Sequence, residues 1–393
     1  MSDNANTVTG LPVLDLAKAN DPNQKQALLG QLRDALFNIG FLYIENHGVA
    51  PQAISNLVSL LPTLFDQPEH AKASLSKIHS PHFLGYSGYA EETTLGNKDL
   101  REQFDFATEL PVIYNPAATA SASRTGAFRD YSRPYWQLRG PNQWPSEDLV
   151  PGFRKAFTEY HNELQQLSYK FVHLVEEAFG IPVGTFDAFF SQPPLSDAAG
   201  QIAPQHRIKL VKYPPSPPAS DGSTQRGQGV GPHKDSSGWL TFLYQVGREE
   251  GLEVLTADGK WISASPIKDT FVVNFGNAFE AATEGAVKAT THRVTLTFRK
   301  APKSSSCPRY SIPFFQGLPL DLTVSEIQSY IPLTVRSLRR SDNHPTPTNG
   351  SVSTFLDPRW DSLGESQLRK WIRSHEDVGR KWYGDDAVAY YLR

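Results

Sequence analysis

The sequence predicts a mainly β protein with surrounding helices, and three observations support this fold class. From about His206 to Phe315 the apolar runs are short and bounded by turn residues, which is typical of a β-sandwich or barrel. A long helical pattern follows Pro151, and we expect this helix to back a sheet. Helical patterns return after about Thr323, so a helical C-terminal extension is expected.

The first part of the chain, residues 1–180, mixes helical and strand patterns and ends with the backing helix. Apolar residues near 3.6 spacing predict a helix over Pro22–Asn38, and Gly40 stands where a left-handed cap ends such a helix. The run Phe41–Ile44 then reads as a strand, and another helical pattern follows it. The backing helix has apolar residues every three or four positions between Phe153 and Ala178.

The β-rich part contains six apolar runs that we interpret as strands. A loop rich in Pro, Gly and Ser is expected over Pro214–Gly231, and residues 341–352 are expected to form a surface loop or a lid. A C-terminal helix is expected to include Gln367–Ser374. The six expected strands are Arg207–Tyr213, Trp239–Val246, Leu252–Leu255, Phe271–Phe275, His292–Phe298 and Tyr310–Phe315.

Composition excludes several function classes. The formal net charge of −3 gives no electrostatic case for nucleic acid or an anionic membrane as partner. There is no apolar run of the roughly 20 residues that a bilayer requires, and the N-terminus does not read as a signal peptide. The one cysteine, Cys307, excludes an intrachain disulfide framework and a thiolate zinc site. We therefore expect a cytoplasmic enzyme that acts on a small molecule, with an oligomeric state that the sequence does not indicate.

A His-x-Asp motif, His233 and Asp235, follows the Gly/Pro-rich loop. On an extended chain, residues two apart point to the same face, so both side chains could reach one ion. Lys234 between them should point the other way. A third ligand is needed, and among the 11 histidines His292 alone follows downstream in a strand pattern after a turn. Two imidazoles and one carboxylate form the set that suits non-haem Fe(II) and leaves coordination positions open.

A carboxylate-binding pair stands in the last expected strand. Arg309 and Ser311 are two residues apart, so a guanidinium and a hydroxyl share one face. This pair suits a planar carboxylate, and Tyr213 at the end of an earlier strand could add a hydrogen bond. A dicarboxylate could therefore chelate the metal at one end and meet Arg309 at the other.

With these residues in place, the chain resembles the 2-oxoglutarate and Fe(II)-dependent oxygenases of the isopenicillin N synthase-like group, in their fungal and bacterial branch. The resemblance covers roughly residues 10–320. The ordered set of motifs is specific, whereas His-x-Asp alone is weak. The motifs are Leu11–Asp15, Gly40–Val49, Lys212–Pro215, His233–Asp235, Gly251–Val254, Val272–Asn277, Thr291–Val294 and Arg309–Ser311.

The resemblance implies a double-stranded β-helix, or jelly-roll, core over residues 200–320. It implies one oxygenase domain over residues 1–393, with residues 321–393 as the helical extension. It also implies Fe(II), 2-oxoglutarate and O2 as reactants, with ascorbate as a supporting reductant. Iron would be held by His233, Asp235 and His292, and 2-oxoglutarate by Arg309, Ser311 and Tyr213, the sets that the motifs above already indicate.

The resemblance also points to a substrate mouth, and it has departures. Glu92 and Thr94 lie in a region that lines the mouth in the family, so both are candidate substrate contacts. Val211 stands where plant relatives often carry Asn, which puts one co-substrate contact in doubt. The segments 214–229 and 299–308 are long for the family and could shape the entrance.

The reaction that the resemblance implies is oxidation of a substrate C–H bond by hydroxylation, desaturation or ring closure, with release of succinate and CO2. The fungal branch points to secondary metabolism. Three alternatives stay open at this point: an oxidase like isopenicillin N synthase that takes no 2-oxoglutarate, an ethylene-forming variant, and a non-catalytic metal-binding relative. Against the second, Ser236 stands where that variant has a tyrosine.

Overall fold

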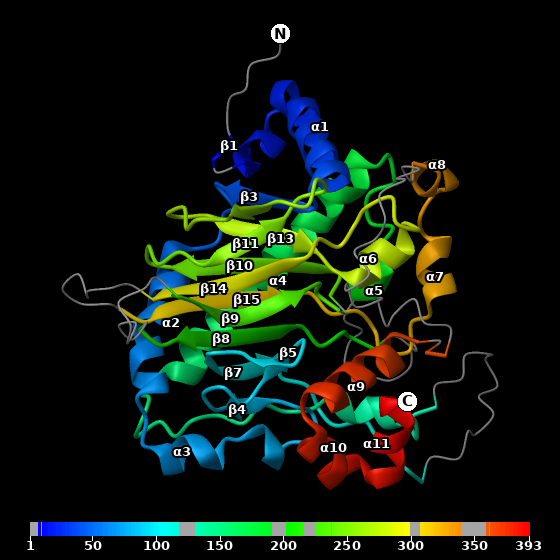
Figure 1. Cartoon of the computed structure of the whole chain (residues 1–393). Coiled ribbons are helices and arrows are strands. Elements are labelled where there is room, and N and C mark those ends of the chain that lie inside the picture. The colour runs from blue at the N-terminus through cyan, green and yellow to red at the C-terminus, as the bar shows by residue number, and fades with distance from the viewer. Residues whose placement is uncertain are drawn as a thin grey trace.

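Two β-sheets form the centre of the computed structural model of the chain (Figure 1). The structure describes residues 7–8, 10–117, 130–190, 202–215, 225–236, 238–298, 307–338, 359–360 and 362–393. Within these residues the larger sheet has nine strands. In sheet order they are β1 (Thr7–Val8), β2 (Leu11–Asp15), β3 (Phe41–Glu45), β13 (Phe271–Phe275), β10 (Leu240–Val246), β15 (Arg309–Phe315), β8 (Arg207–Tyr213), β7 (Glu102–Ala107) and β4 (Gly85–Ser87).

The smaller sheet completes the jelly roll that the sequence predicted. Its four strands and four of the larger sheet, β8, β10, β13 and β15, alternate along the chain, except that β11 and β12 follow each other in the smaller sheet. A buried apolar cluster between the sheets includes Tyr43, Val211, Val254, Val272 and Val294. In sheet order the smaller sheet is β12 (Trp261–Ser263), β11 (Leu252–Leu255), β14 (His292–Phe298) and β9 (Gln225–His233); a separate hairpin is β5 (Thr93–Thr94) with β6 (Asn97–Lys98).

Helices cover the other face of the larger sheet. The long helix α4 (Phe153–Ala178) lies behind it with α1 (Pro22–Asn38) and α2 (Pro51–Phe65), and their apolar side chains join those of the sheet in the largest core. The prediction of a backing helix is confirmed. The shorter helical segments before the jelly roll are η1 (Leu16–Asn20), α3 (Glu69–Ser74), η2 (Lys77–His79), η3 (Pro134–Leu138) and α5 (Asp187–Phe190).

The C-terminal helices gather at one corner of the molecule, beside β7 and the start of β8 (Figure 1). Their apolar side chains form a third core with Phe83 and with Trp136 of η3. This contact joins the C-terminal helices to segments of the first 140 residues. The later helices are α6 (Asn277–Ala282), α7 (Val324–Ser329), α8 (Leu333–Arg336), α9 (Leu363–Ser374), α10 (Glu376–Tyr383) and α11 (Asp385–Leu392).

The expected elements match closely, with one correction. Helix α1 has the predicted bounds, and Gly40 after it has φ of +71°, as a left-handed cap requires. The expected loop Pro214–Gly231 is wrong in its second half, because β9 already begins at Gln225. The glycines of this segment are not typical of a strand, but close packing against the paired strand requires one of them. A Cβ on Gly229 would lie 2.9 Å from Cγ1 of Val294, on the paired strand.

Some expectations fall on parts of the chain that are not described. Residues 341–352, the expected loop or lid, lie outside the described residues. Most residues of the segments 214–229 and 299–308 lie outside them too. The division into residues 1–180, 200–320 and 321–393 stays a prediction. Among the described residues, no helix is long and apolar enough to cross a membrane.

Candidate metal centre

The jelly roll brings His233, Asp235 and His292 together. His233 is the last residue of β9 and His292 the first of β14, and the two residues are direct partners in the sheet. One ligand atom from each of the three side chains can be chosen so that all lie within 4.8 Å of one another. Oδ1 of Asp235 lies 4.0 Å from Nε2 of His233 and 3.7 Å from Nε2 of His292. Three donor atoms therefore converge on one point.

Backbone carbonyls fix which imidazole nitrogens face that point. Nδ1 of His233 lies 2.8 Å from the carbonyl oxygen of Gly231, and Nδ1 of His292 lies 3.1 Å from that of Thr290. A carbonyl only accepts, so each Nδ1 carries the proton and each Nε2 presents a lone pair to the centre. Burial, followed by the neighbouring His292, lowers the pKa of His233 to about 3, so its ring is neutral at pH 7. A neutral imidazole is the form that binds a metal.

Two side chains hold the carboxylate of Asp235. Oδ2 accepts hydrogen bonds of 2.7 Å from Oγ1 of Thr241 and from Nδ2 of Asn274. These two residues are direct partners on β10 and β13. Burial would raise the pKa of Asp235, but the two imidazoles and these hydrogen bonds outweigh burial and lower it. The remaining oxygen, Oδ1, is left to face the imidazoles.

Sequence reasoning missed Thr241 and Asn274. A signal was present, because each is a polar residue flanked by apolar residues in a strand, and both side chains are buried. A buried polar side chain needs a partner, so both positions could have been identified as supports for a polar centre. Lys234 behaves as predicted, since its Nζ turns away to Glu280 at 3.1 Å.

The expected carboxylate anchor lies at one end of β15. Arg309 pairs with Tyr213 across the sheet, and its guanidinium lies 4.9 Å from the centroid of the Tyr213 ring. Nη2 donates to Gln245 at 3.0 Å, whereas Nε and Nη1 are buried and have no hydrogen-bond partner among the described residues. Ser311 is buried two residues further along the same strand. A guanidinium with two open donors suits a planar carboxylate.

Comparisons with known proteins agree with this geometry. Residues 204–317 match the family model of the 2OG-Fe(II) oxygenase superfamily, and residues 11–147 match the N-terminal model of a non-haem dioxygenase in morphine synthesis. The chain is 37% identical to 2-oxoglutarate-dependent dioxygenase frbJ of Dothideomycetidae sp. strain 11243, over 95% of this chain and 91% of the relative. It is 32% identical to a 2-oxoglutarate-dependent dioxygenase of Gibberella zeae, over 97% and 93%.

The chain belongs to the 2-oxoglutarate- and Fe(II)-dependent oxygenases.

Solved structures show the same fold for this oxygenase. The full-length Neurospora crassa T7H in complex with alpha-KG has a TM-score of 0.60 at 22% identity, covering 86% of this chain and 95% of that one. A putative 2OG-Fe(II) oxygenase family protein from Caulobacter crescentus has a TM-score of 0.63 at 21% identity, covering 90% and 99%. These structures confirm the predicted fold class, and the family model and the relatives confirm the need for Fe(II) and 2-oxoglutarate.

A cavity borders the metal centre of the oxygenase. It is lined by Asp235 and Ser236, by the start of β8 and by Lys370 and Trp371 of α9. It encloses about 520 Å³, including the part open to solvent. Along β8 the side chains of Lys209 and Tyr213 share one face and lie about 13 Å apart at 3.3 Å per residue. The cavity therefore lies well away from the Arg309 end.

Glu92 and Thr94 are both held by other protein groups. Glu92 is buried, and its oxygens lie 3.0 Å from Nζ of Lys77 and 2.8 Å from Nη2 of Arg101. Oγ1 of Thr94 donates to Asp99 at 2.8 Å. Burial would raise the pKa of Glu92, but attraction to Lys209, Lys77 and Arg101 outweighs burial and lowers it. The structure thus shows an ion-pair role for Glu92, and substrate contact by either residue stays a prediction.

Proposed function

We propose that the oxygenase holds Fe(II) with His233, Asp235 and His292 and oxidises a C–H bond of a small organic substrate. The reaction would be a hydroxylation, desaturation or ring closure coupled to conversion of 2-oxoglutarate into succinate and CO2. The observation that carries this proposal is the donor set. Two Nε2 atoms and one Oδ1 converge, and each ligand is held from behind by a hydrogen bond.

This donor set fits Fe(II). Two neutral imidazoles and one carboxylate on one side of an ion match the preference of non-haem iron and leave the opposite side open. When bound there, Fe(II) with 2-oxoglutarate supplies the activation of O2. The chain contributes fixed ligand orientation through Thr241 and Asn274.

We assign 2-oxoglutarate binding to Arg309, with Ser311 and Tyr213. One edge of the Arg309 guanidinium, made by Nη2 and an open neighbouring nitrogen, would receive the carboxylate far from the iron, and the ring of Tyr213 holds the guanidinium in place. Gln245 accepts one hydrogen bond from Nη2, so the open edge of the guanidinium is oriented in advance. The fungal relatives named above support a substrate from secondary metabolism.

Succinate release tests the proposal. The purified protein with Fe(II), 2-oxoglutarate, O2 and a metabolite library should release succinate, and mass spectrometry should show a product with altered hydrogen or oxygen content. His292→Ala should abolish the release, whereas Lys234→Gln should keep it, because that side chain points to Glu280. Oxygen consumption with product but no succinate would instead show an oxidase that needs no 2-oxoglutarate.

A further inference from the structure

We propose that the substrate is an organic acid whose carboxylate binds Lys370 in the cavity beside Asp235. This inference rests on the proposed function, because it concerns what the same centre oxidises. Lys370 lies on α9, in the C-terminal extension, and lines this cavity together with Asp235 and Trp371. A substrate held there has its carbon atoms next to the metal ligands.

Lys370 is a cation without a protein counterion. No carboxylate among the described residues lies within 4.0 Å of its Nζ. Its Nζ instead lies 4.9 Å from the centroid of the Trp371 ring. The side chain is half-buried, so its charge has a desolvation cost that the carboxylates of the described residues, Asp235 and Asp105 among them, offset only in part. An anionic ligand would offset this cost.

The groups that face Lys370 give the cavity a positive excess. Lys209 lies 3.6 Å from Asp105 and 4.0 Å from Glu92, but both carboxylates also pair with Lys77, at 2.7 and 3.0 Å. Arg207 donates to three backbone carbonyl oxygens and has no carboxylate within 4.0 Å among the described residues. Asp235 is committed to the metal centre. Cations therefore outnumber the carboxylates available to them, which favours an anion and disfavours a cationic substrate.

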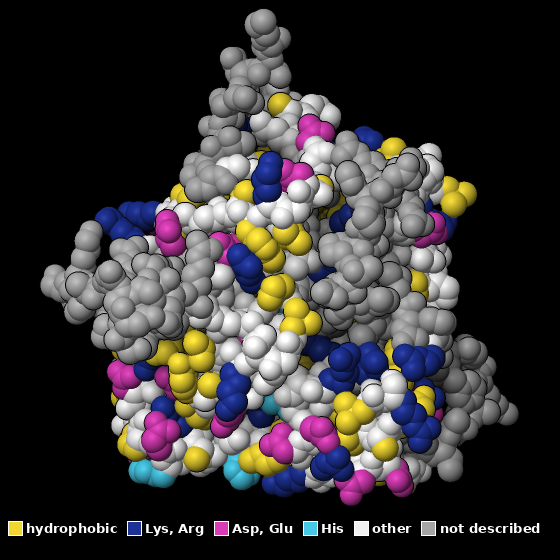
Figure 2. Space-filling view, in the orientation of Figure 1, with side chains coloured by type: hydrophobic (Ala, Val, Ile, Leu, Met, Phe, Trp, Pro, Cys, Tyr) yellow, Lys and Arg dark blue, Asp and Glu magenta, His cyan; other side chains and the backbone are white. Residues whose placement is uncertain are grey.

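Lys370 carries its charge at neutral pH. Burial, followed by the nearby Lys209, lowers its pKa to about 8, which still leaves most of it protonated at pH 7. On the outer surface, Lys and Arg side chains lie among Asp and Glu side chains at the corner formed by α9, α10 and α11, so the charge that favours an anion is that of the cavity lining (Figure 2).

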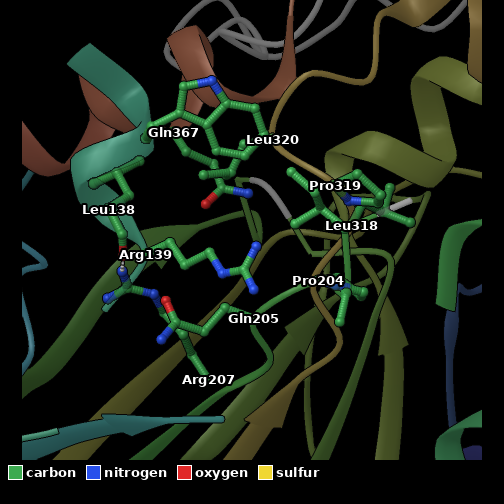
Figure 3. Close-up of a pocket in the computed structure, with 12 residues that line it drawn as sticks. Leu138, Arg139, Pro204, Gln205, Arg207, Leu318, Pro319, Leu320 and Gln367 are labelled. Atoms are coloured by element: carbon green, nitrogen blue, oxygen red, sulfur yellow. Dashed lines mark hydrogen bonds between the residues drawn. The ribbon is translucent and has the colours of Figure 1, made fainter. Parts of the chain in front are cut away.

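An adjoining cavity has several apolar residues in its lining. Figure 3 shows Arg139 and Gln367 pointing into it, between Leu138 on one side and Leu318 on the other. The two cavities adjoin because they share three lining residues, Gln205, Arg207 and Gln367. The apolar members of its lining include Leu138, Ile202, Pro204, Leu318, Pro319 and Leu320. A cation in one cavity and apolar residues in the other together suit an acid with an apolar portion.

The test compares acids with their uncharged amides. Phenylacetate and phenylacetamide, and hexanoate and hexanamide, are titrated by calorimetry into protein loaded with Fe(II) and saturating 2-oxoglutarate, without oxygen. Saturating 2-oxoglutarate keeps the acids from Arg309. At least one acid should bind at least about tenfold more tightly than its amide. Lys370→Met should remove the difference and Lys370→Arg should keep it.

A matched control is available on the next helix. Lys381 is exposed and precedes a tryptophan as Lys370 does, with its Nζ 5.4 Å from the ring centroid of Trp382. Lys381→Met should keep the preference for acids. Equal affinity for acid and amide in the wild type, no binding of any acid, or an unchanged preference in Lys370→Met would overturn the inference. The visible band of the Fe(II)–2-oxoglutarate complex, recorded in the same samples, shows separately whether the proposed function holds.

Discussion

The sharpest quantitative prediction concerns Arg309 and the affinity for 2-oxoglutarate. Nε and Nη1 are buried and unpartnered among the described residues, and the second N–H of Nη2 shares an edge with one of them, so one edge can give two hydrogen bonds to the co-substrate. A hydrogen bond to a charged group contributes about 1.5–3 kcal/mol, and about 1.4 kcal/mol corresponds to a tenfold change in Kd. Arg309→Met loses both bonds, so the Kd should rise at least about a hundredfold. Arg309→Lys keeps the charge but not the planar fork, and a rise of about tenfold is expected.

The assay is an anaerobic titration of the Fe(II)-loaded protein with 2-oxoglutarate, followed by visible absorbance. Arg293→Lys is the control, because this arginine also stacks on an aromatic ring, Trp261 at 3.9 Å, but pairs with Glu253. The Kd of Arg293→Lys for 2-oxoglutarate should equal that of the wild type. A Kd for Arg309→Met within about threefold of the wild type, with iron fully loaded, would refute the reasoning.

The same substitution should not destabilise the fold. Burial lowers the pKa of Arg309, which shows that its charged form is disfavoured where it lies. Replacing a poorly paired buried charge with an apolar side chain of similar length is often neutral or stabilising. Thermal unfolding without 2-oxoglutarate should therefore give Arg309→Met a Tm equal to or above that of the wild type. A large fall would show that Arg309 is structural.

Three further predictions follow from the contacts described above. Asn274→Ala removes a hydrogen bond from Asp235 and should weaken Fe(II) binding about 10- to 100-fold, measured by competition with a chelator. Lys77→Met leaves Asp105 without its closest cation in a buried position and should lower the free energy of unfolding by about 3–5 kcal/mol, measured by denaturant titration. Binding of the preferred acid should weaken as pH rises through about 8, because Lys370 loses its proton there.

Each of these predictions has a control and a contrary outcome. Asn56→Ala, at a half-buried position of α2 where the side chain accepts from Gln52, should leave iron affinity unchanged, and equal affinities in both asparagine variants would contradict the supporting role of Asn274. Lys155→Met removes an exposed pair with Glu159 and should cost about 0.5 kcal/mol or less. Lys370→Arg should bind the acid independently of pH up to about 10, since arginine stays protonated. The same fall above pH 8 in this variant would assign the titration to another group.

The strands of the catalytic core could be predicted because their apolar runs are short and clearly bounded. Arg207–Tyr213 and Phe271–Phe275 have the predicted ends. The strand β9 could not, because it is rich in glycine and its extended form depends on pairing with β14 and close packing by Val294. Local propensity gives no signal for a strand that neighbouring strands impose.

The donor set could be predicted from spacing, but its surroundings could not. His233 and Asp235 are two residues apart, so both side chains can project from the end of one strand. The β pattern around His292 predicted that this residue lies in the same sheet. The contact of Lys370 with the cavity depends on α9 packing beside β8, more than 130 residues away in sequence. No periodicity in α9 indicates which core element it meets, so this wall of the cavity required the structure.

The most direct test of the central claim is the visible spectrum of the anaerobic Fe(II) protein with and without 2-oxoglutarate. The account predicts a charge-transfer band that needs both iron and 2-oxoglutarate, that is lost in Asp235→Ala and that is retained in Lys234→Gln. A protein that is fully loaded with iron but shows no 2-oxoglutarate-dependent band would contradict the assignment of Fe(II) and 2-oxoglutarate binding to this centre.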